Sequence, residues 1–399
     1  MAKAQRDLTM EEQLARGPMD LPFLMLTLML LVIGLITVFS ASYATAYYDG
    51  ISPYNYFMKQ AIVGVAGVLV LYFVSKLNYQ HWRWMSPFVL LFAIVLLILV
   101  IPFGWGRAEV GAQRWITIGP INFQPSEFAK LGVVLYFSAR LSKRSTGKKK
   151  KWNRRSITGR VLGFLDKIGL LELIPYAAIL LVVAFLMLLE PHMSGTILIM
   201  VAGAAVLFAS GIRLYWFVGG GALAAGALWY IINNTDYMTA RIELWHDPWI
   251  DELGQGFQSI QSLLAIGSGG LLGKGLGNST QKHLFLPEPE NDFVFSILCE
   301  EMGFIGAALV LVLFAMLILR GYWLAIHARD RFGALLIVGI ITLFAFQVFF
   351  NIGVVTGLLP VTGISLPFFS YGGTALLIQL AEMGIVLSVS RQIPAAKQG

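Results

Sequence analysis

Residues 21–40 decide the fold, and they read LPFLMLTLMLLVIGLITVFS. The run contains no charged residue and few polar ones. A helix rises about 1.5 Å per residue, so the run is long enough to cross the roughly 30 Å hydrocarbon core of a bilayer. A polar stretch precedes it, and no small-residue cleavage site clearly closes it. We therefore interpret it as a retained membrane span and not as a cleaved signal peptide.

Similar apolar runs recur along the whole chain. Of the 399 residues, 57% are hydrophobic and 13% are charged, whereas a soluble domain carries roughly 25% charged residues. We predict an all-α polytopic membrane protein of about ten transmembrane helices, with long extracytoplasmic loops. The predicted spans are 21–44, 60–76, 86–103, 126–141, 173–189, 195–211, 214–233, 291–319, 333–357 and 371–390.

The charges orient this predicted bundle. Ten spans put both termini on one side, which predicts a cytoplasmic segment 1–20, a membrane domain 21–390 and a cytoplasmic tail 391–399. In this arrangement 22 of the 29 Lys and Arg residues lie on the cytoplasmic side, many of them in a basic loop, 142–172. That asymmetry follows the positive-inside rule. Twelve of the 22 acidic residues lie on the outer side, so carboxylate chemistry is expected there.

Composition also limits the partners. Cys299 is the only cysteine, which excludes an intrachain disulfide and a multi-cysteine metal site. The net charge of +7 lies in loops between spans. We interpret it as a signal for orientation and for anionic membrane lipids, and not for nucleic acid.

The extracytoplasmic loop 234–290 is long enough to suggest a functional segment. Within it, residues 257–266 are partly apolar but too short to span, which predicts an interfacial or re-entrant segment. The glycine-rich stretch GSGGLLGKG follows. It has Ser268 and Gly275 where a phosphate-binding loop needs Gly and Ser or Thr, so we interpret it as a re-entrant turn.

Polar residues gather at the start of the predicted fourth span, in the stretch GAQRWITIGPINFQPSEFAK that ends at Lys130. Glu127 lies three residues before Lys130, so the two share a helix face and can pair. Ser126 is placed to cap the helix. One interpretation is a structural cap and salt bridge, with Trp115 as an interfacial aromatic. The other is a polar cluster in which Arg114 and these residues face an anionic ligand.

Carboxylates crowd the mouth of the predicted eighth span, where LPEPENDF contains Glu288, Glu290 and Asp292. Asp292 is a candidate helix N-cap and a candidate catalytic base, and the two roles are compatible. Glu300 and Glu301 lie deeper in the same span. Carboxylates at such depth usually face a bundle interior or a polar cavity.

Prolines and glycines interrupt the chain before the last span, where residues 359–374 read LPVTGISLPFFSYGGT. Irregular backbone at membrane depth is tolerated only beside a cavity or other protein. The segment is therefore either a tight loop or part of a site, to which Ser370 and Tyr371 would offer hydroxyl groups.

Together and in this order, these segments resemble the SEDS family of glycan polymerases, which includes RodA, FtsW and SpoVE. The most specific pieces are GAQRWI with FQPSEFAKL, QSLLAIGSGGLLGKGLGNSTQKHLFLPEPENDFVF with EEMGFIG, and NIGVVTGLLPVTGISLPFFSYGGT. The LPEPENDF form is most similar to the FtsW and SpoVE branch. One departure is EPHMSGT, in which His192 stands where the family usually has an Asp.

The resemblance implies a peptidoglycan glycosyltransferase that polymerises lipid II for cell division or related septal wall synthesis. It implies a place in the bacterial cytoplasmic membrane, with the chemistry at its outer face and Asp292 as the essential carboxylate. The implied substrate-binding residues are Arg114, Trp115, Glu127, Lys130, Glu288, Ser370 and Tyr371. The implied partners are a class B penicillin-binding protein, which supplies the transpeptidase, and other division or elongation proteins.

Such a reaction needs a base for a sugar hydroxyl and stabilisation of a pyrophosphate leaving group. Asp292 suits the first need, and Arg114 and Lys130 suit the second. A divalent cation, Mg²⁺ or Mn²⁺, is the alternative for the second, and no organic cofactor is expected. Two other functions stay open: a lipid II flippase or transporter, which also places polar groups in broken helices, and a non-catalytic scaffold for division enzymes.

Overall fold

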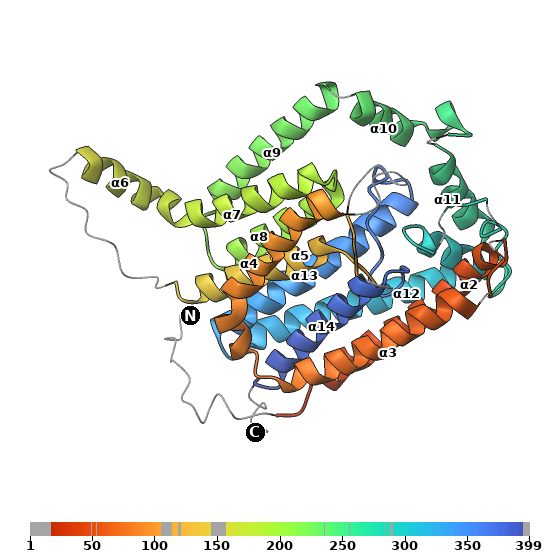
Figure 1. Ribbon diagram of the computed structural model, residues 1–399, viewed down its shortest axis with the longest axis horizontal. Helices are drawn as coiled ribbons and strands as arrows, with labels where there is room; N and C mark the ends of the chain where they lie inside the picture. The colour runs from red at the N-terminus through yellow and green to blue at the C-terminus, as the bar shows by residue number, and fades with distance from the viewer. Residues whose placement is uncertain are drawn as a thin grey trace.

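The computed structural model describes residues 17–48, 50–52, 54–104, 114–118, 121–144, 157–234, 236–254, 256–283, 285–287 and 290–393. Most of the helices run side by side as an elongated bundle (Figure 1). In chain order the elements are α2 (Leu21–Tyr48), α3 (Tyr54–Lys76), α4 (Gln80–Phe103), β1 (Ile116–Ile118), β2 (Ile121–Phe123), α5 (Pro125–Ser142), α6 (Ile157–Ile168), α7 (Leu170–Leu189), α8 (Met193–Ala209), α9 (Leu214–Asn234), α10 (Asp236–His246), η1 (Pro248–Asp251), α11 (Phe257–Ser268), α12 (Val294–His327), α13 (Arg331–Val355) and α14 (Gly373–Ser390).

The structure confirms an all-α polytopic membrane protein. Every predicted span coincides with a helix, namely α2, α3, α4, α5, α7, α8, α9, α12, α13 and α14. Within the described residues, seven helices are long and apolar enough to cross a membrane: α2, α3, α4, α7, α12, α13 and α14. The total number of spans stays a prediction, because α5, α8 and α9 fall outside that set.

Some boundaries differ from the prediction. The span predicted at 291–319 belongs to a helix that continues to His327. Arg320 directly follows the predicted end of this span and, as a charged residue, indicates a loop. In the structure the Nε and Nη2 atoms of Arg320 donate to the carboxylate of Asp20 at 3.0 and 2.5 Å. This pairing offsets the charge and lets the helix continue. The predicted loop 142–172 also contains α6, and loop 234–290 contains α10, η1 and α11.

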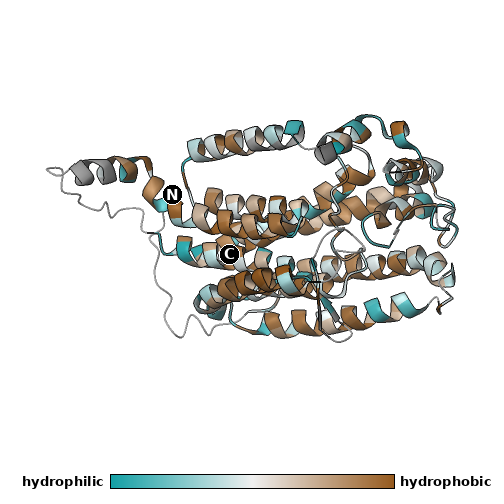
Figure 2. Cartoon of the chain, turned by 45° about the horizontal axis from the view of Figure 1, so that its top comes forward, coloured by the Kyte–Doolittle hydropathy of each residue, from teal (hydrophilic) through white to brown (hydrophobic). Residues whose placement is uncertain are grey.

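The last two helices form the centre of the bundle. In the most apolar 18-residue stretch of α13 and of α14, 72% of the residues are buried, compared with 28% in α3 and in α4. Helix α13 packs against α5, α8 and α12, and α14 packs mainly against α3. The helices are hydrophobic over much of their length (Figure 2). Many of their large apolar side chains are exposed, as expected for helices that face lipid chains.

Both ends of the membrane domain meet at one end of the bundle. The N–H of Gly17 donates to the carbonyl of Arg391 at 2.7 Å, and Arg391 Nε donates to the carbonyl of Gly17 at 3.2 Å. We call this the terminal end. Helices α10 and α11 lie toward the other end, which we call the distal end (Figure 1). Because Gly17 and Arg391 lie side by side, an even number of crossings is expected between them.

Candidate active site

A short β-hairpin introduces the first polar group, and the sequence analysis did not predict it. Strand β1 pairs antiparallel with β2, with Ile116 opposite Phe123. Helix α5 then begins at Pro125, with Gln124 at the N-cap position. Proline suits the first helical position because it needs no backbone donor there. The predicted cap by Ser126 is therefore wrong: Ser126 lies inside the first turn, and its buried hydroxyl has no hydrogen-bond partner in the described chain.

The predicted pair of Glu127 and Lys130 is present on the first turns of α5. Lys130 Nζ lies 2.6 Å from Glu127 Oε2, and both side chains are largely buried. Glu382 on α14 is also buried and lies close enough to act electrostatically on both. The bundle thus encloses one lysine between two carboxyl groups. Charged groups placed inside a membrane bundle usually mark a functional cavity.

The turn between α7 and α8 brings further ionisable groups to this region. Arg114 Nη2 donates to the carbonyl of Pro191 at 2.6 Å. The residues on either side of this proline, Glu190 and His192, are both buried. Both carboxyl oxygens of Glu190 lack a hydrogen-bond partner among the residues that the structure describes. Glu190 and His192 form the part of this region that the sequence analysis did not assign to a site.

Burial sets the charge state of both groups. It raises the pKa of the Glu190 carboxyl to about 8, although the nearby Arg114 guanidinium acts in the opposite direction. It lowers the pKa of His192 to about 3, and the charges of Arg114 and Lys130 lower it further. At neutral pH the turn therefore presents a neutral imidazole and a largely protonated carboxyl. The departure at His192 replaces the usual acidic side chain with a neutral ring.

Asp292 belongs to a second polar group. Helix α12 begins at Val294 with Phe293 at the N-cap position, so Asp292 lies one residue before the cap and not at it. Asn351 of α13 fixes this residue, because its Nδ2 donates to the Asp292 carbonyl at 2.7 Å and to the Ile364 carbonyl at 2.8 Å. The Asp292 side chain is half-buried. Its Oδ2 would lie 3.4 Å from a Cβ built on Gly363.

The loop 359–372 between α13 and α14 therefore packs against Asp292. It is non-helical, as predicted, and Phe368 and Phe369 anchor it in the core. Tyr371 N–H donates to the carbonyl of Glu290 at 2.8 Å. Burial raises the pKa of the Tyr371 phenol, and the charge of Glu290 raises it further. The loop thus brings Tyr371 to the same segment that carries Asp292.

The other predicted residues have varied positions. The Ser370 hydroxyl donates to the Leu366 carbonyl at 3.2 Å, which leaves its lone pairs for other contacts. Trp115 is half-buried and immediately precedes β1. Glu288 lies outside the described residues. The structure therefore gathers Arg114, Glu127 and Lys130 in one group, and Asp292, Ser370 and Tyr371 in another.

The glycine-rich stretch after α11 docks into a break in α12. Gly303 has φ +67° and ψ −171°, which interrupts the helix. The backbones on the two sides exchange hydrogen bonds: Lys274 N–H donates to the Glu300 carbonyl at 3.0 Å, and Phe304 N–H donates to the Gly270 carbonyl at 2.9 Å. A Cβ on Gly273 would lie 2.1 Å from the Glu301 carbonyl oxygen. Only glycine permits so close an approach, so these glycines serve backbone packing.

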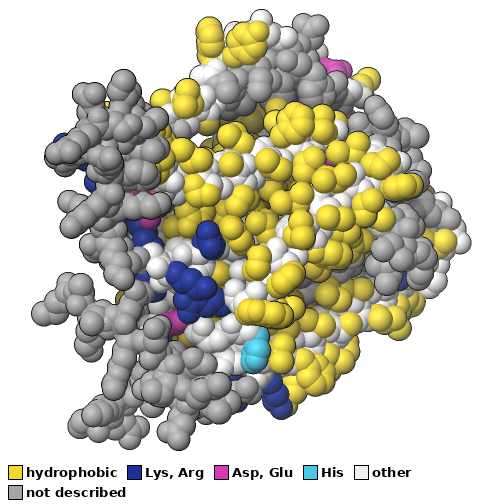
Figure 3. Space-filling model, turned by 60° about the vertical axis from the view of Figure 1, so that its left-hand side comes forward, with side chains coloured by type: hydrophobic (Ala, Val, Ile, Leu, Met, Phe, Trp, Pro, Cys, Tyr) yellow, Lys and Arg dark blue, Asp and Glu magenta, His cyan; other side chains and the backbone are white. Residues whose placement is uncertain are grey.

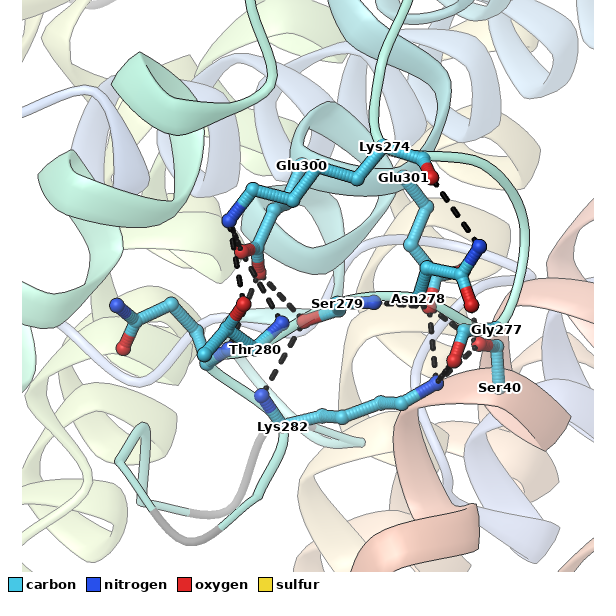
Figure 4. A network of polar contacts seen from close by, with 10 residues as sticks. Ser40, Lys274, Gly277, Asn278, Ser279, Thr280, Lys282, Glu300 and Glu301 are labelled. Carbon is cyan, nitrogen blue, oxygen red and sulfur yellow. Dashed lines mark hydrogen bonds and ion pairs between the residues drawn. The ribbon is translucent and has the colours of Figure 1, made fainter.

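Two ion pairs secure the same docking (Figure 4). Lys274 Nζ lies 2.5 Å from Glu300, whose other oxygen accepts from Ser279. The second pair, Lys282 and Glu301, is at 3.0 Å and is almost wholly buried.

Ser40 of α2 joins the second pair. Its Oγ donates to both carboxyl oxygens of Glu301, at 2.6 and 2.8 Å, and accepts from Lys282 Nζ at 3.1 Å. The expectation that Glu300 and Glu301 face a polar interior is thus confirmed. The sequence analysis missed their lysine partners. Two carboxylates inside a membrane bundle require positive partners. This requirement could have indicated that lysines pair with them.

The metal expectation stays a prediction. Within the described residues, no three His, Cys, Asp or Glu side chains converge as a metal site. These described side chains therefore give no ligand set for Mg²⁺ or Mn²⁺.

The fold and these polar groups define a class: a polytopic α-helical membrane protein that holds ion pairs inside its bundle and an aspartate at the mouth of a broken helix. Within this class the chain belongs to the FtsW/RodA/SpoVE family, described as cell cycle proteins, whose sequence profile matches residues 21–394.

Individual relatives agree with this assignment. The chain is 40% identical to stage V sporulation protein E of Bacillus subtilis over 93% of its own length and 97% of the relative's. It is 39% identical to a probable peptidoglycan glycosyltransferase FtsW of Geobacter metallireducens, over 94% and 95%. These two relatives confirm the similarity to the FtsW and SpoVE branch.

Solved structures share the fold. A chain of a peptidoglycan synthase complex, described as coordinating polymerization and crosslinking, matches with a TM-score of 0.72 and 28% identity over 95% of this chain and 99% of that one. The rod shape determining protein RodA of Thermus thermophilus matches with a TM-score of 0.65 and 27% identity over 95% and 98%.

Proposed function

We propose that this protein is a peptidoglycan glycosyltransferase that polymerises lipid II into glycan strands, in cell division or sporulation. The placement of Asp292 supports the proposal most directly. Its carboxyl is half-exposed just before the start of α12 and lies beside the loop 359–372. Further along α12, backbone hydrogen bonds from the glycine-rich stretch hold the helix break at Gly303. The relatives named as peptidoglycan glycosyltransferases support the same activity.

Asp292 is proposed as the general base. A carboxylate accepts the proton of the acceptor sugar hydroxyl as its oxygen bonds to the donor's anomeric carbon. The bond from that carbon to the pyrophosphate oxygen breaks, and undecaprenyl pyrophosphate leaves with the electron pair. Attack from the face opposite the leaving group inverts the anomeric configuration. Proton, bond and leaving group are thereby all accounted for.

The pyrophosphate requires positive charge, and Arg114 and Lys130 are the proposed sources. An arginine fork grips phosphate oxygens at two points, whereas a lysine acts as a compact charge. Glu127 holds Lys130 in place through their 2.6 Å contact. Trp115, Glu288, Ser370 and Tyr371 keep their proposed roles as substrate-binding residues.

The proposed orientation puts the terminal end in the cytoplasm. The basic loop 142–172 and both chain ends then lie on the cytoplasmic side, in keeping with the positive-inside rule. Asp292 then lies on the extracytoplasmic side of the bacterial cytoplasmic membrane. Outer-face labelling of a cysteine placed at exposed Leu253, in a Cys299→Ala background, tests this orientation. Labelling only after the membrane is permeabilised would reverse it.

The proposed partner is a class B penicillin-binding protein. One structural relative comes from a peptidoglycan synthase complex that couples polymerization to crosslinking. A transpeptidase bound beside the polymerase would receive new strands directly. Further division proteins are also proposed as partners.

The decisive experiment is polymerisation of purified lipid II by the full-length protein, with and without a candidate penicillin-binding protein. Asp292→Asn should fold and insert normally yet make no polymer. Asp251→Asn is the matched control, because this exposed aspartate lies in η1 and not in the segment that leads into α12. Polymer yield from Asp292→Asn close to that of the wild type would exclude Asp292 as the base.

The same preparation separates the other functions. In vesicles, a flippase would move labelled lipid II between leaflets without lengthening it. A scaffold would show neither activity and would retain its cellular role after Asp292→Ala. Polymer formation that depends on Asp292 distinguishes the enzyme from both.

A further inference from the structure

A basic cavity lies at the terminal end, at the opposite end of α5 from Glu127 and Lys130. It has a volume of about 320 Å³ and lies between the first turns of α4 and the last turns of α5. Three cations line it, namely Arg83, Arg140 and Lys143. Among the described residues, no carboxylate lines it. The hydrogen bond from Gln392 to Asn78, at 3.0 Å, places the start of α4 beside the chain end.

Proline helps to shape this cavity. Pro87 lies inside α4 and has no N–H, so the carbonyl of Arg83, four residues earlier, loses its helical donor. The Ser86 hydroxyl donates to that carbonyl instead, at 3.0 Å. The Nε of Arg83 is buried and has no hydrogen-bond partner in the part of the chain described. Because Nε is enclosed by protein, a ligand with acceptor oxygens would have to bind the guanidinium group through its two terminal nitrogens.

The remaining wall is apolar and continues along the bundle. Trp84 and Phe88 line the cavity and are 74% and 58% exposed. Leu91 and Val95 follow at helical spacing on α4 and are also exposed. Figure 3 looks onto this end and shows Lys and Arg side chains beside a broad hydrophobic surface. The cavity therefore has a cationic mouth and an apolar exit toward the bilayer interior.

We propose that this cavity binds the headgroup of an anionic phospholipid, with its acyl chains along the exposed face of α4. An inorganic anion would pair with the three cations but would leave the apolar surfaces of Trp84 and Phe88 without a ligand contact. A zwitterionic lipid would use the apolar face but would bring a positive group to three others. Only an amphipathic anion uses both halves.

The test measures lipid occupancy of the purified full-length protein by native mass spectrometry. The probes are dioleoyl phosphatidylglycerol, dioleoyl phosphatidylcholine, inorganic phosphate and a short acidic peptide. The variant is Arg83→Gln/Arg140→Gln/Lys143→Gln. The matched control is Lys76→Gln/Lys167→Gln/Arg213→Gln, which neutralises three exposed cations at the same end but outside the cavity.

Each cation near an anionic headgroup contributes about fivefold to affinity. The triple variant should therefore bind phosphatidylglycerol about a hundredfold more weakly. The control triple should bind like the wild type, and phosphatidylcholine should bind weakly to all three proteins. Lys143→Gln alone changes only the exposed C-cap residue of α5. Its affinity for phosphatidylglycerol should fall about fivefold. That single variant keeps the test valid if the triple variant fails to fold.

Four results would overturn the proposal. They are equal phosphatidylglycerol binding by the cavity variant and the wild type, an equal loss in the control triple, displacement of the lipid by equimolar inorganic phosphate, and preferential binding of an acidic peptide. The last would assign the cavity to a protein segment. Lipid occupancy does not depend on polymerisation, so this test and the test of Asp292 can fail independently.

Discussion

Lys282→Met is the sharpest perturbation of the network that holds α12. The Lys282 and Glu301 side chains are only 3% and 1% exposed, so water does not screen them. Removal of one partner leaves the other charge buried, which costs about 3–5 kcal/mol in unfolding free energy. Glu301 would retain the hydroxyl of Ser40, at 2.6 Å, but no cation from the loop. We therefore expect Lys282→Met to lower the free energy of unfolding by about 3–5 kcal/mol.

A second lysine calibrates this magnitude. Lys274 also pairs with a buried carboxylate, but its side chain is 33% exposed. Solvent reduces the energy of such a pair, so Lys274→Met should cost about 1–3 kcal/mol. Lys59→Met is the control, because Lys59 is exposed on α3 and its loss should change stability by less than about 0.5 kcal/mol.

The assay is reversible unfolding of the purified protein in detergent and denaturant, followed by helical circular dichroism. The double variant Lys282→Met/Glu301→Gln retains neither charge. It should therefore be about 2 kcal/mol more stable than the sum of the two single losses predicts. Losses that add to within about 0.5 kcal/mol would refute the view that the two charges compensate each other.

Three further predictions use the same preparation. Lys130→Ala should weaken the use of lipid II, seen as a raised KM in initial polymerisation rates; unchanged kinetics would leave only its pairing with Glu127. Because the pKa of Glu190 rises from 4.5 to about 8 on folding, the native state holds an extra proton between these values. Stability should therefore fall with rising pH in that window, by about 1.4 kcal/mol per unit at most, and level off above it. Glu190→Gln should flatten this dependence in unfolding curves at pH 5 to 8, and an unchanged slope would assign it elsewhere. Gly303→Ala should destabilise by about 1–3 kcal/mol from its backbone alone, since only glycine adopts φ +67° with ψ −171° readily. Gly220→Ala on α9, where no atom lies within 4 Å of the added methyl group, should be neutral or slightly stabilising in the same unfolding assay.

The helices of this protein were predictable because their signal is local. An apolar run long enough to cross a bilayer has few other stable conformations, so α2, α13 and α14 begin and end close to the predicted positions. The pair of Glu127 and Lys130 was predictable for the same reason, since a spacing of three residues fixes a shared helix face.

Features that depend on distant partners were not predictable. No proline in α12 signals the break at Gly303, and its cause is the backbone of residues 270–274. Lys274, the partner of Glu300, comes from the glycine-rich stretch that the sequence analysis interprets as a re-entrant turn, and Lys282, the partner of Glu301, comes from the loop just after it. The position of His192 near Arg114 and Lys130 depends on how α5 and α8 pack, which the chain's periodicity does not encode.

The burial of the last two helices has a consequence for biosynthesis. A ribosome delivers the chain from its N-terminus, so the helices that complete the core enter the membrane after all the others. Until α14 is inserted, α3 lacks its main packing partner, and Gln60 lacks the carbonyl of Ser370 to which it donates at 3.1 Å. A nascent chain released before α14 is therefore expected to be a substrate for membrane quality control.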